Sequence, residues 1–257
     1  MIYNIVSKVI KALFPKTITF KKVLGTKQIL HYEKAQHLTF LFKKDIDYEP
    51  KIREYIKAYI SKDDLIFDIG ANIGQYSLLY SEWVGCNGRV IAIEPDPVNF
   101  AFLQFNINRN TLTNVTALNI GVSDKENRMP FFRDSTTGGR RSSFIKENVG
   151  ENYTGNVVMV DIRTIDFLIE EYGEPQFVKI DVEGFEVSVV CGLSKELKKT
   201  VFFIEVREET KTKIFEFFRE RNYSCVLLER GTQVNTLLEI PSFANLLFIP
   251  ETLINEE

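Results

Sequence analysis

Histidine is scarce in this chain of 257 residues, and cysteine is sparse and scattered. The two histidines, His31 and His37, are too few for a histidine-rich metal site, so that class of centre is excluded. The three cysteines, Cys86, Cys191 and Cys225, are odd in number and form no C-x-x-C pair. We expect them to be small buried hydrophobes in a reducing compartment, which predicts a cytoplasmic location.

An excess of positive charge and long apolar runs are also missing. A net charge of −3 offers no general attraction to nucleic acid, so we expect no nucleic-acid partner. No apolar run approaches the roughly 20 residues that a membrane-spanning helix requires. In residues 2–14, apolar positions recur at helical spacing with lysines between them. We expect this helix to dock on its own domain or on a partner subunit in an oligomer; peripheral contact with an anionic membrane stays open.

The composition that remains suits a globular α/β protein. With 44% hydrophobic residues and 21 phenylalanines, the chain can build a sizeable core. Stretches typical of strands alternate with stretches typical of helices, which predicts a doubly wound, mostly parallel sheet. We divide the chain into an N-terminal extension, residues 1–46, with a helix and short strands, and a main domain, residues 47–257.

Periodicity and helix-capping residues predict the individual elements. Strands are predicted at 65–69, 89–93, 115–118, 177–180, 201–206, 224–228 and 245–249, and helices at 50–60, 74–83, 97–109, 164–172 and 210–221. In the extension, alternation of apolar and polar residues predicts short strands at 17–20 and 37–42. Residues 123–156 are polar, charged and glycine-containing, which predicts a long irregular loop with a functional role.

The most informative stretch is 65–74, followed by Glu94. It predicts a buried strand, a glycine turn and a helix start, and then a second strand that ends in a carboxylate. An α/β sheet binds adenosine-containing cofactors at such carboxyl ends. Gly70 permits the sharp turn and Gly74 permits close packing of the helix. Glu94 is then placed to accept hydrogen bonds from both ribose hydroxyls.

The spacing of the turn distinguishes two classes of cofactor. The dinucleotide fingerprint G-x-G-x-x-G requires a glycine where this chain has Asn72. Asp68 beside the turn repels a pyrophosphate, but it suits a ligand with a sulfonium and an ammonium, such as S-adenosylmethionine. The alternative is a strand-to-helix turn capped by glycine, which needs neither Asp68 nor Glu94.

A group of carboxylates follows the strand predicted at 177–180. Asp181 leaves the strand end, Glu183 and Glu186 follow on the turn and helix start, and Glu205 ends the next predicted strand. Crowded carboxylates raise one another's pKa, which suits a general base near neutral pH. They also suit a divalent cation that acidifies a substrate hydroxyl. For Glu183 and Glu186, the alternative is that acidic side chains favour a helix N-terminus.

Three segments together give the chain a family resemblance. Residues 67–74, 94–95 and 178–184 resemble the FkbM family of S-adenosylmethionine-dependent methyltransferases, and the segment Lys-Ile-Asp-Val-Glu-Gly is the most discriminating. The resemblance covers about residues 47–206. It implies a Rossmann-like class I methyltransferase sheet of seven strands with the last one antiparallel. It also implies O-methylation of a sugar, glycan or other natural-product acceptor by the domain at 47–257.

The resemblance and the carboxylate pattern assign roles to individual residues. The expected cofactor contacts are Glu49, Asp68, Gly70, Ala71, Asn72, Gly74, Glu94, Pro95, Asp96, Gly121, Val122 and Asp124. Asp181 and Glu183, completed by Glu205, would take the proton of the acceptor hydroxyl, directly or through a bound divalent cation. The expected acceptor contacts are Arg140, Arg141, Ser142 and Glu186.

Two other functional classes stay open. A nicotinamide-dependent oxidoreductase shares the architecture, but this chain lacks the middle glycine and has no Tyr-x-x-x-Lys pair at an appropriate place. A non-catalytic module would keep the fold and bind a partner. The presence of Asp68, Glu94 and Asp181 together argues against such a loss of activity.

Overall fold

The computed structural model describes most of the chain. The described residues are 17–34, 36–37, 40, 44–46, 49–134, 142–150 and 153–254. The helix predicted over residues 2–14 lies outside them, so its contacts with protein or membrane stay a prediction. Among the helices of the described residues, none has the length and apolar character that crossing a bilayer requires.

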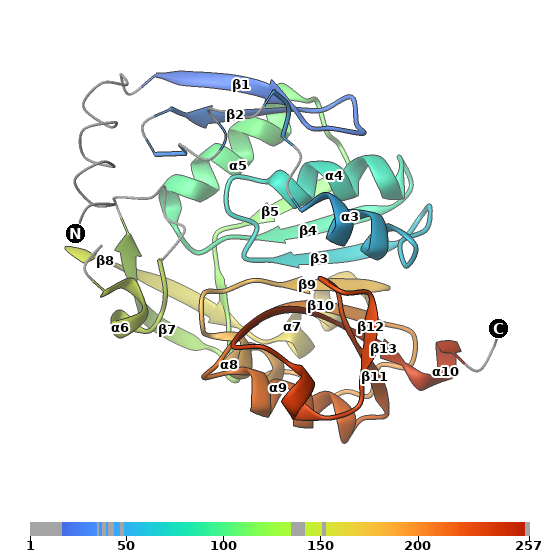
Figure 1. Ribbon diagram of the computed structural model, residues 1–257. Coiled ribbons are helices and arrows are strands. Elements are labelled where there is room, and N and C mark those ends of the chain that lie inside the picture. The colour runs from blue at the N-terminus through green and yellow to red at the C-terminus, as the bar shows by residue number, and fades with distance from the viewer. Residues whose placement is uncertain are drawn as a thin grey trace.

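A sheet of eight strands, in the order β12-β11-β13-β10-β9-β3-β4-β5, forms the centre of the molecule (Figure 1). The strands are β3 (Leu65–Ile69), β4 (Arg89–Ile93), β5 (Val115–Leu118), β9 (Phe177–Ile180), β10 (Val201–Arg207), β11 (Tyr223–Leu227), β12 (Thr232–Val234) and β13 (Phe243–Pro250). Strands β5, β4, β3, β9 and β10 are parallel, and β13 runs antiparallel between β10 and β11. This confirms the predicted class I arrangement, with the short edge strand β12 added to it.

Helices cover both faces of the sheet (Figure 1). On one face lie α3 (Pro50–Lys57), α4 (Gln75–Val84) and α5 (Pro97–Arg109), and on the other lie α7 (Ile165–Tyr172), α8 (Glu186–Cys191) and α9 (Lys211–Arg219). The remaining helical segments, α6 (Lys146–Val149), α10 (Glu251–Ile254) and the 3-10 turn η2 (Leu237–Glu239), are short. The alternation of strands and helices along the sequence therefore confirms the doubly wound prediction.

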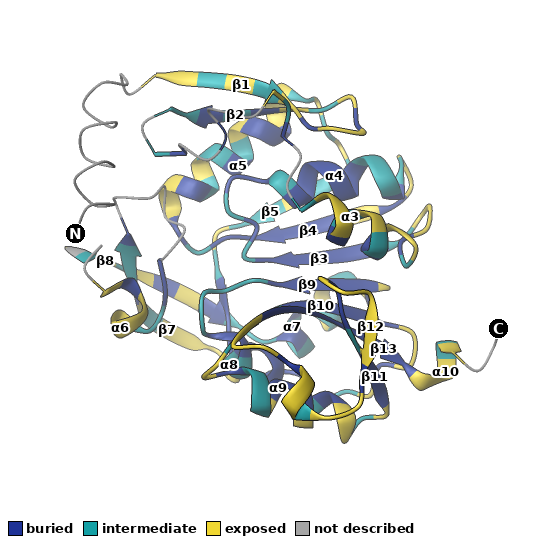
Figure 2. Cartoon of the chain, viewed as in Figure 1, coloured by how far each residue is buried: buried dark blue, intermediate teal, exposed yellow. Residues whose placement is uncertain are grey.

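The position of β3 explains why its sequence is almost entirely apolar. All five of its residues are buried, with Ile66 packed toward α3 and α4 and Phe67 toward α7 and α8. A parallel strand with helices on both faces buries both rows of its side chains. Figure 2 shows the same distribution for the molecule, with buried residues concentrated in the central strands and exposed residues on the outer sides of the helices.

A second sheet projects from the central one, and we call it the arm. It consists of β6 (Gly121–Val122), β7 (Asn127–Asp134) and β8 (Tyr153–Arg163), together with the described residues 142–150 between β7 and β8. The predicted irregular loop over 123–156 is therefore wrong at 127–134, 146–149 and 153–156, which form β7, α6 and the start of β8. Phe131, Val160 and Ile162 form a buried row in this sheet, whereas the opposite face mixes the charged Arg128 and Asp161 with the exposed apolar Val157 and Met159. That mixture hid the alternation in the sequence.

A short hairpin near the N-terminus packs beside α5, and its buried residues Val23, Leu30 and Tyr32 share a core cluster with α3 and α4. Strands β1 (Ile18–Lys22) and β2 (Ile29–Glu33) pair antiparallel, which confirms the strand predicted at 17–20. The strand predicted at 37–42 is wrong at Phe40, which is helical, and residues 38–39 and 41–42 lie outside the described residues. The outer edge of β2 would expose unpaired backbone groups, but Asn106 of α5 and Asn110, which caps the end of that helix, hydrogen-bond to it.

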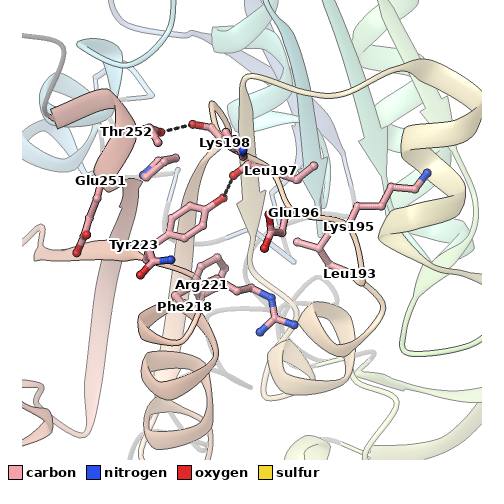
Figure 3. Close-up of a pocket in the computed structure, with 12 residues that line it drawn as sticks. Leu193, Lys195, Glu196, Leu197, Lys198, Phe218, Arg221, Tyr223, Glu251 and Thr252 are labelled. Atoms are coloured by element: carbon pink, nitrogen blue, oxygen red, sulfur yellow. Dashed lines mark hydrogen bonds between the residues drawn. The ribbon is translucent and has the colours of Figure 1, made fainter.

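A small pocket opens near the start of β10, lined in part by Leu197, Tyr223 and Thr252 (Figure 3). Tyr223 closes one side of it by donating a hydrogen bond of 2.6 Å to the carbonyl of Leu197. None of the residues that the sequence assigns to a functional site lines this pocket. It lies at the amino end of β10, opposite the edge at which an open parallel sheet forms its ligand crevice.

Asn106 provides a test of how the hairpin is attached. Its side chain accepts from the N–H of His31 at 2.7 Å and donates to the carbonyls of His31 and Ile73 at 3.1 and 2.8 Å. Because these backbone groups would be left unsatisfied, Asn106→Ala should lower the free energy of unfolding by about 2–4 kcal/mol in urea titrations. Asn108→Ala, an exposed asparagine of the same helix, should cost about 0.5 kcal/mol or less. Equal costs would show that the asparagine contacts do not hold the hairpin.

Candidate functional site

The glycine turn after β3 brings the ends of two strands together. Gly70 has φ +84°, and a Cβ there would lie 1.9 Å from the carbonyl oxygen of Asp181. Only glycine therefore allows the turn to pass the end of β9. Asn72 also has a positive φ of 52°, and its backbone N–H donates to the carboxylate of Glu94 at 2.8 Å. The turn thus joins β3, β4 and β9 at their carboxyl ends.

Gly74 continues the turn into α4. It has φ +99°, and a Cβ there would lie 2.9 Å from a methyl group of Leu103 in α5. The N–H groups of Gly70 and Ala71 both donate to the carbonyl of Ile93 at 2.9 Å. The backbone of the turn is therefore held close to β4, and α4 and α5 pack tightly beside it.

Glu94 lies at the end of β4 and is 5% exposed. One carboxylate oxygen accepts from the N–H of Asp96 and the other from the N–H of Asn72, both at 2.8 Å. Burial and the neighbouring charge of Asp96 raise the pKa of Glu94 from 4.5 to about 8, although the two N–H groups oppose the shift. Each oxygen of a carboxylate can accept a further hydrogen bond. This buried acceptor beside a glycine turn fits the ribose of an adenosine-containing cofactor.

Asp96 is occupied within the protein. Its carboxylate caps α5 by accepting from the N–H groups of Val98 and Asn99, and it pairs with the guanidinium of Arg133 at 2.8 Å. Arg133 belongs to β7 of the arm, so this ion pair ties the arm to the cofactor side. The sequence did not predict a role for Arg133, because its partner is known only once the arm is folded. A contact between Asp96 and the cofactor stays a prediction.

The other expected cofactor contacts surround the same edge. Asn119 donates to the carbonyls of Glu94 and Pro95, at 2.8 and 3.1 Å, and so holds the loop after β4. Gly121 and Val122 are buried in β6, and Asp124 is exposed and accepts from Ser123. The structure gathers these residues after β4 and β5, and their contacts with a ligand stay predictions.

Lys179 of β9 lies at the centre of the site, and no role was predicted for it. Its ammonium is 3.1 Å from Asp181, 3.8 Å from Asp68 and 5.1 Å from the ring centroid of Tyr76. The side chain is 4% exposed. Burial alone would lower the pKa of Lys179, but the charges of Asp181 and Asp68 outweigh it and raise the pKa. Lys179 is therefore a permanent buried cation between two carboxylates.

Asp68 faces into the protein. It is fully buried, accepts from Ser77 at 2.6 Å, and has its pKa raised by burial despite the nearby Lys179. Glu49, in the left-handed region at φ 50°, accepts from the hydroxyl of Tyr76 at 3.0 Å, and burial raises its pKa too. Both acids thus border the Lys179 group, and a direct contact of either with a cofactor stays a prediction.

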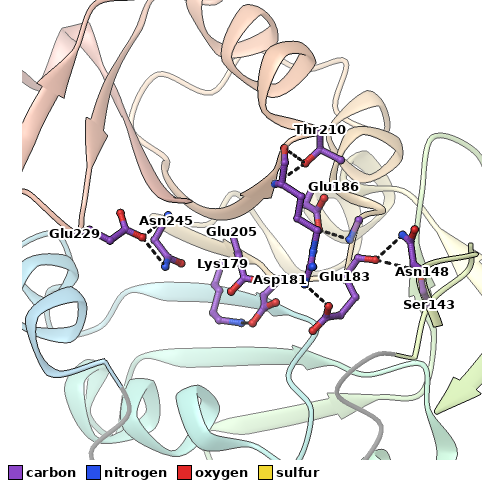
Figure 4. Close-up of polar contacts among 12 residues, drawn as sticks. Ser143, Asn148, Lys179, Asp181, Glu183, Glu186, Glu205, Thr210, Glu229 and Asn245 are labelled. Carbon is purple, nitrogen blue, oxygen red and sulfur yellow. Dashed lines mark hydrogen bonds and ion pairs between the residues drawn. The ribbon is translucent and has the colours of Figure 1, made fainter. Parts of the chain in front are cut away.

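Three of the predicted carboxylates meet at the ends of β9 and β10 (Figure 4). Asp181, Glu183 and Glu205 each place an oxygen within 4.8 Å of the others. Burial, followed by the charges of Asp181 and Glu183, raises the pKa of Glu205 to about 9. Arg207 contacts Glu183 and lies 3.5 Å from Glu205. We call these three acids with Lys179 and Arg207 the carboxylate cluster.

The turn that carries Glu183 is held by the arm. Glu183 has φ 54° and Gly184 has φ 92°, a conformation that costs free energy at the non-glycine position. The carbonyl of Glu183 accepts from Asn148 at 2.9 Å and from Ser143 at 3.2 Å. A Cβ on Gly184 would lie 2.3 Å from the Asn148 amide, so glycine is required for this contact. The arm therefore reaches both the cofactor side and the carboxylate cluster.

Two of the expected acceptor contacts bond to backbone instead of pointing outward. Glu186 is 1% exposed and accepts from the N–H of Gly184 at 2.8 Å. Ser142 accepts from the N–H of Asp134 at 2.9 Å. Arg140 and Arg141 lie outside the described residues. The role of these four residues in binding an acceptor stays a prediction.

The raised pKa of Glu94 predicts a pH-dependent stability. Because the folded protein keeps a proton that the unfolded chain releases, Glu94 destabilises the fold progressively as the pH rises from about 4.5 to about 8. Glu94→Gln should therefore gain stability relative to wild type across this window, by up to about 1.4 kcal/mol per pH unit. Urea unfolding at several pH values measures this, with the exposed Glu171→Gln as control. Parallel curves for wild type and Glu94→Gln would contradict the shift.

The fold aligns with those of solved structures, at low sequence identity. A methyltransferase FkbM from Methylobacillus flagellatus KT aligns with a TM-score of 0.47 and 22% identity over 73% of this chain and 44% of that one. TYW2 of M. jannaschii in complex with AdoMet aligns with a TM-score of 0.46 and 14% identity over 92% and 88%. Both scores lie below 0.5, so nothing about a ligand follows from them.

Sequence comparison identifies the family. Hexuronic acid methyltransferase AglP of Haloferax volcanii is 30% identical over 165 residues, which cover 63% of each chain. Methyltransferase sdnD of Sordaria araneosa is 29% identical over 170 residues, 55% of this chain and 65% of that one. The matches thus span less than two thirds of these relatives. The family model described as the methyltransferase FkbM domain matches residues 68–225, which contain Asp68, the glycine turn, Glu94 and the carboxylate cluster. The chain therefore belongs to the FkbM methyltransferase family, as its motifs predict.

Proposed function

We propose that the protein transfers the methyl group of S-adenosylmethionine to a hydroxyl of a sugar, glycan or other natural-product acceptor. The observation that supports this most is the contact between two halves of the site. The glycine turn that precedes α4 lies against the carbonyl of Asp181. A buried ribose acceptor, Glu94, and a partly exposed carboxylate, Asp181, therefore flank one turn at one edge of the sheet.

On the cofactor side, the residues fit the adenosine and methionine parts of the ligand. Glu94 would hydrogen-bond to the ribose hydroxyls through the proton that its raised pKa retains and through the lone pairs that its two backbone partners leave. The positive-φ turn at Gly70, Asn72 and Gly74 lets the ligand approach the backbone. When bound, S-adenosylmethionine supplies a methyl group on a sulfonium, from which transfer is favourable. The protein's task is then to align the acceptor and to remove one proton.

Among the predicted catalytic acids, Asp181 is the one suited to act as the general base. Its side chain is 32% exposed, so an acceptor hydroxyl can reach it. Glu205 has a pKa raised to about 9, so it holds a proton at neutral pH and can donate a hydrogen bond to the acceptor. Glu183 is paired with Arg207. We infer that the proton passes from the acceptor hydroxyl to a carboxylate oxygen of Asp181 and from there to solvent.

A divalent cation is the alternative route to an activated hydroxyl. Asp181, Glu183 and Glu205 offer three oxygen ligands, the type that such cations prefer. Lys179 and Arg207 already bring two positive charges to these acids. We therefore favour direct proton transfer, because a cation would have to displace Arg207 from Glu183.

The acceptor class follows from chemistry and from the relatives. Carboxylates bind vicinal hydroxyls well, and three of them surround the place where the acceptor would lie. AglP is named for a hexuronic acid, which is a sugar derivative, and this supports a carbohydrate acceptor without identifying it. A nicotinamide-dependent oxidoreductase is disfavoured by the family, and a non-catalytic module remains an outcome of the test below.

Binding of S-adenosylhomocysteine by calorimetry tests the proposal. Glu94→Ala should weaken it by about 10- to 150-fold, or about 1.5–3 kcal/mol, through lost hydrogen bonds to the ribose. Asp181→Asn should bind it within about threefold of wild type but cut methyl transfer to glycoside acceptors by at least about 10²-fold. Nicotinamide dinucleotide is the control ligand and should not bind. Tight binding without transfer to any acceptor would favour a non-catalytic module, and binding of the dinucleotide alone would overturn the proposal.

A further inference from the structure

One face of β10 and β13 changes from buried and apolar to more exposed and polar toward the carboxylate cluster. Residues two apart along a strand point to the same face, and Glu205 pairs with Asn245 as Arg207 pairs with Phe243. Nearer the start of β10, this face carries the buried Phe203. From Glu205 onward it is polar and increasingly exposed, with side-chain exposures of 16% at Glu205 and 37% at Arg207.

Phe243 is the exception on this polar part of the face. It is 50% exposed and does not belong to a buried core cluster. The guanidinium of Arg207 lies 5.8 Å from its ring centroid, on the strand directly paired with it. Because consecutive residues on a strand are about 3.3 Å apart, the backbone of Phe243 lies about 7 Å beyond Glu205 along the sheet. An exposed aromatic ring is therefore held beside the groups proposed to bind an acceptor hydroxyl.

We propose that Phe243 and Arg207 form a subsite on which an uncharged pyranose ring of the acceptor stacks. This inference rests on the proposed function, because it assumes that the hydroxyl to be methylated faces Asp181. The apolar C–H face of the sugar would cover the Phe243 ring. The hydroxyls at the edge of the sugar ring would hydrogen-bond to Arg207 and to the carboxylates. Such a pairing of one apolar face with a few convergent polar groups is how sites fix the orientation of a ligand.

Charge determines which sugars fit. Arg207 already contacts Glu183 and lies 3.5 Å from Glu205, so its guanidinium is occupied by partners within the protein. A carboxylate on the acceptor would have to displace one of them and would approach Asp181 as well. Like charges this close repel each other strongly when poorly solvated, whereas hydroxyls pair with either charge. The subsite should therefore prefer neutral pyranosides to uronic acids, in contrast to the substrate named for AglP.

Ligand-observed NMR with saturation transfer tests the subsite. The probes are the methyl glycosides of glucose, galactose and mannose and the methyl glucuronide, each with the full chain saturated with S-adenosylhomocysteine. At least one neutral glycoside should bind, and more tightly than the glucuronide. Phe243→Ala should weaken that binding by at least about fivefold, and Phe243→Trp should preserve it, because stacking requires an aromatic face. Phe20→Ala removes an aromatic ring that is 61% exposed on β1 and should change nothing.

The outcomes separate this inference from the proposed function. S-adenosylhomocysteine bound by all variants with no neutral glycoside bound would overturn the subsite and leave the cofactor assignment intact. Tighter binding of the glucuronide would overturn the charge argument, and equal binding by wild type and Phe243→Ala would overturn the stacking. Failure of wild type to bind S-adenosylhomocysteine would instead overturn the proposed function, and this inference with it.

Discussion

The buried ion group around Lys179 is the constraint on which the rest of the site depends. Lys179 in β9 lies directly opposite Asp68 in the register of β3, and its ammonium reaches Asp181 at the end of its own strand. Removing such a cation from water costs several kcal/mol, which its carboxylate partners must offset. The register of β3 against β9 is thereby tied to the position of Asp181. The carbonyl oxygen of Asp181 lies against the glycine turn, and this is why residue 70 must be glycine.

The cofactor side and the acceptor side are linked a second time, through the arm. Arg133 pairs with Asp96 next to Glu94, and Asn148 holds the carbonyl of Glu183 in its strained turn. A change in the arm would therefore alter the ends of α5 and of β9 together. This explains physically why a segment that contributes no strand to the central sheet lies so close to both halves of the site.

The sequence predicted those parts of the molecule that depend on the residues of one short segment. The spacing of apolar residues and of glycines within short segments predicted the strands and helices of the central sheet and the glycine turn. The positions of Asp181, Glu183 and Glu205 at or just after strand ends predicted that these three acids meet. Lys179 received no role, although its motif was recognised, because its partner Asp68 is on another strand. Much of the arm was predicted to be a loop, because its outward face mixes charged residues with exposed apolar ones and so shows no clean alternation. Arg133 and Asn148 have partners that no local pattern reveals.

The most direct test of this account is a double-mutant cycle on Lys179 and Asp68, measured as free energies of unfolding in urea. Lys179→Met alone should cost about 3–5 kcal/mol, because two carboxylates lose their buried counter-ion. Adding Asp68→Asn should restore part of that loss, with a coupling of at least about 2 kcal/mol between the two sites. Additive costs for the two substitutions would show that the buried charges are independent, and would contradict the central role given to Lys179.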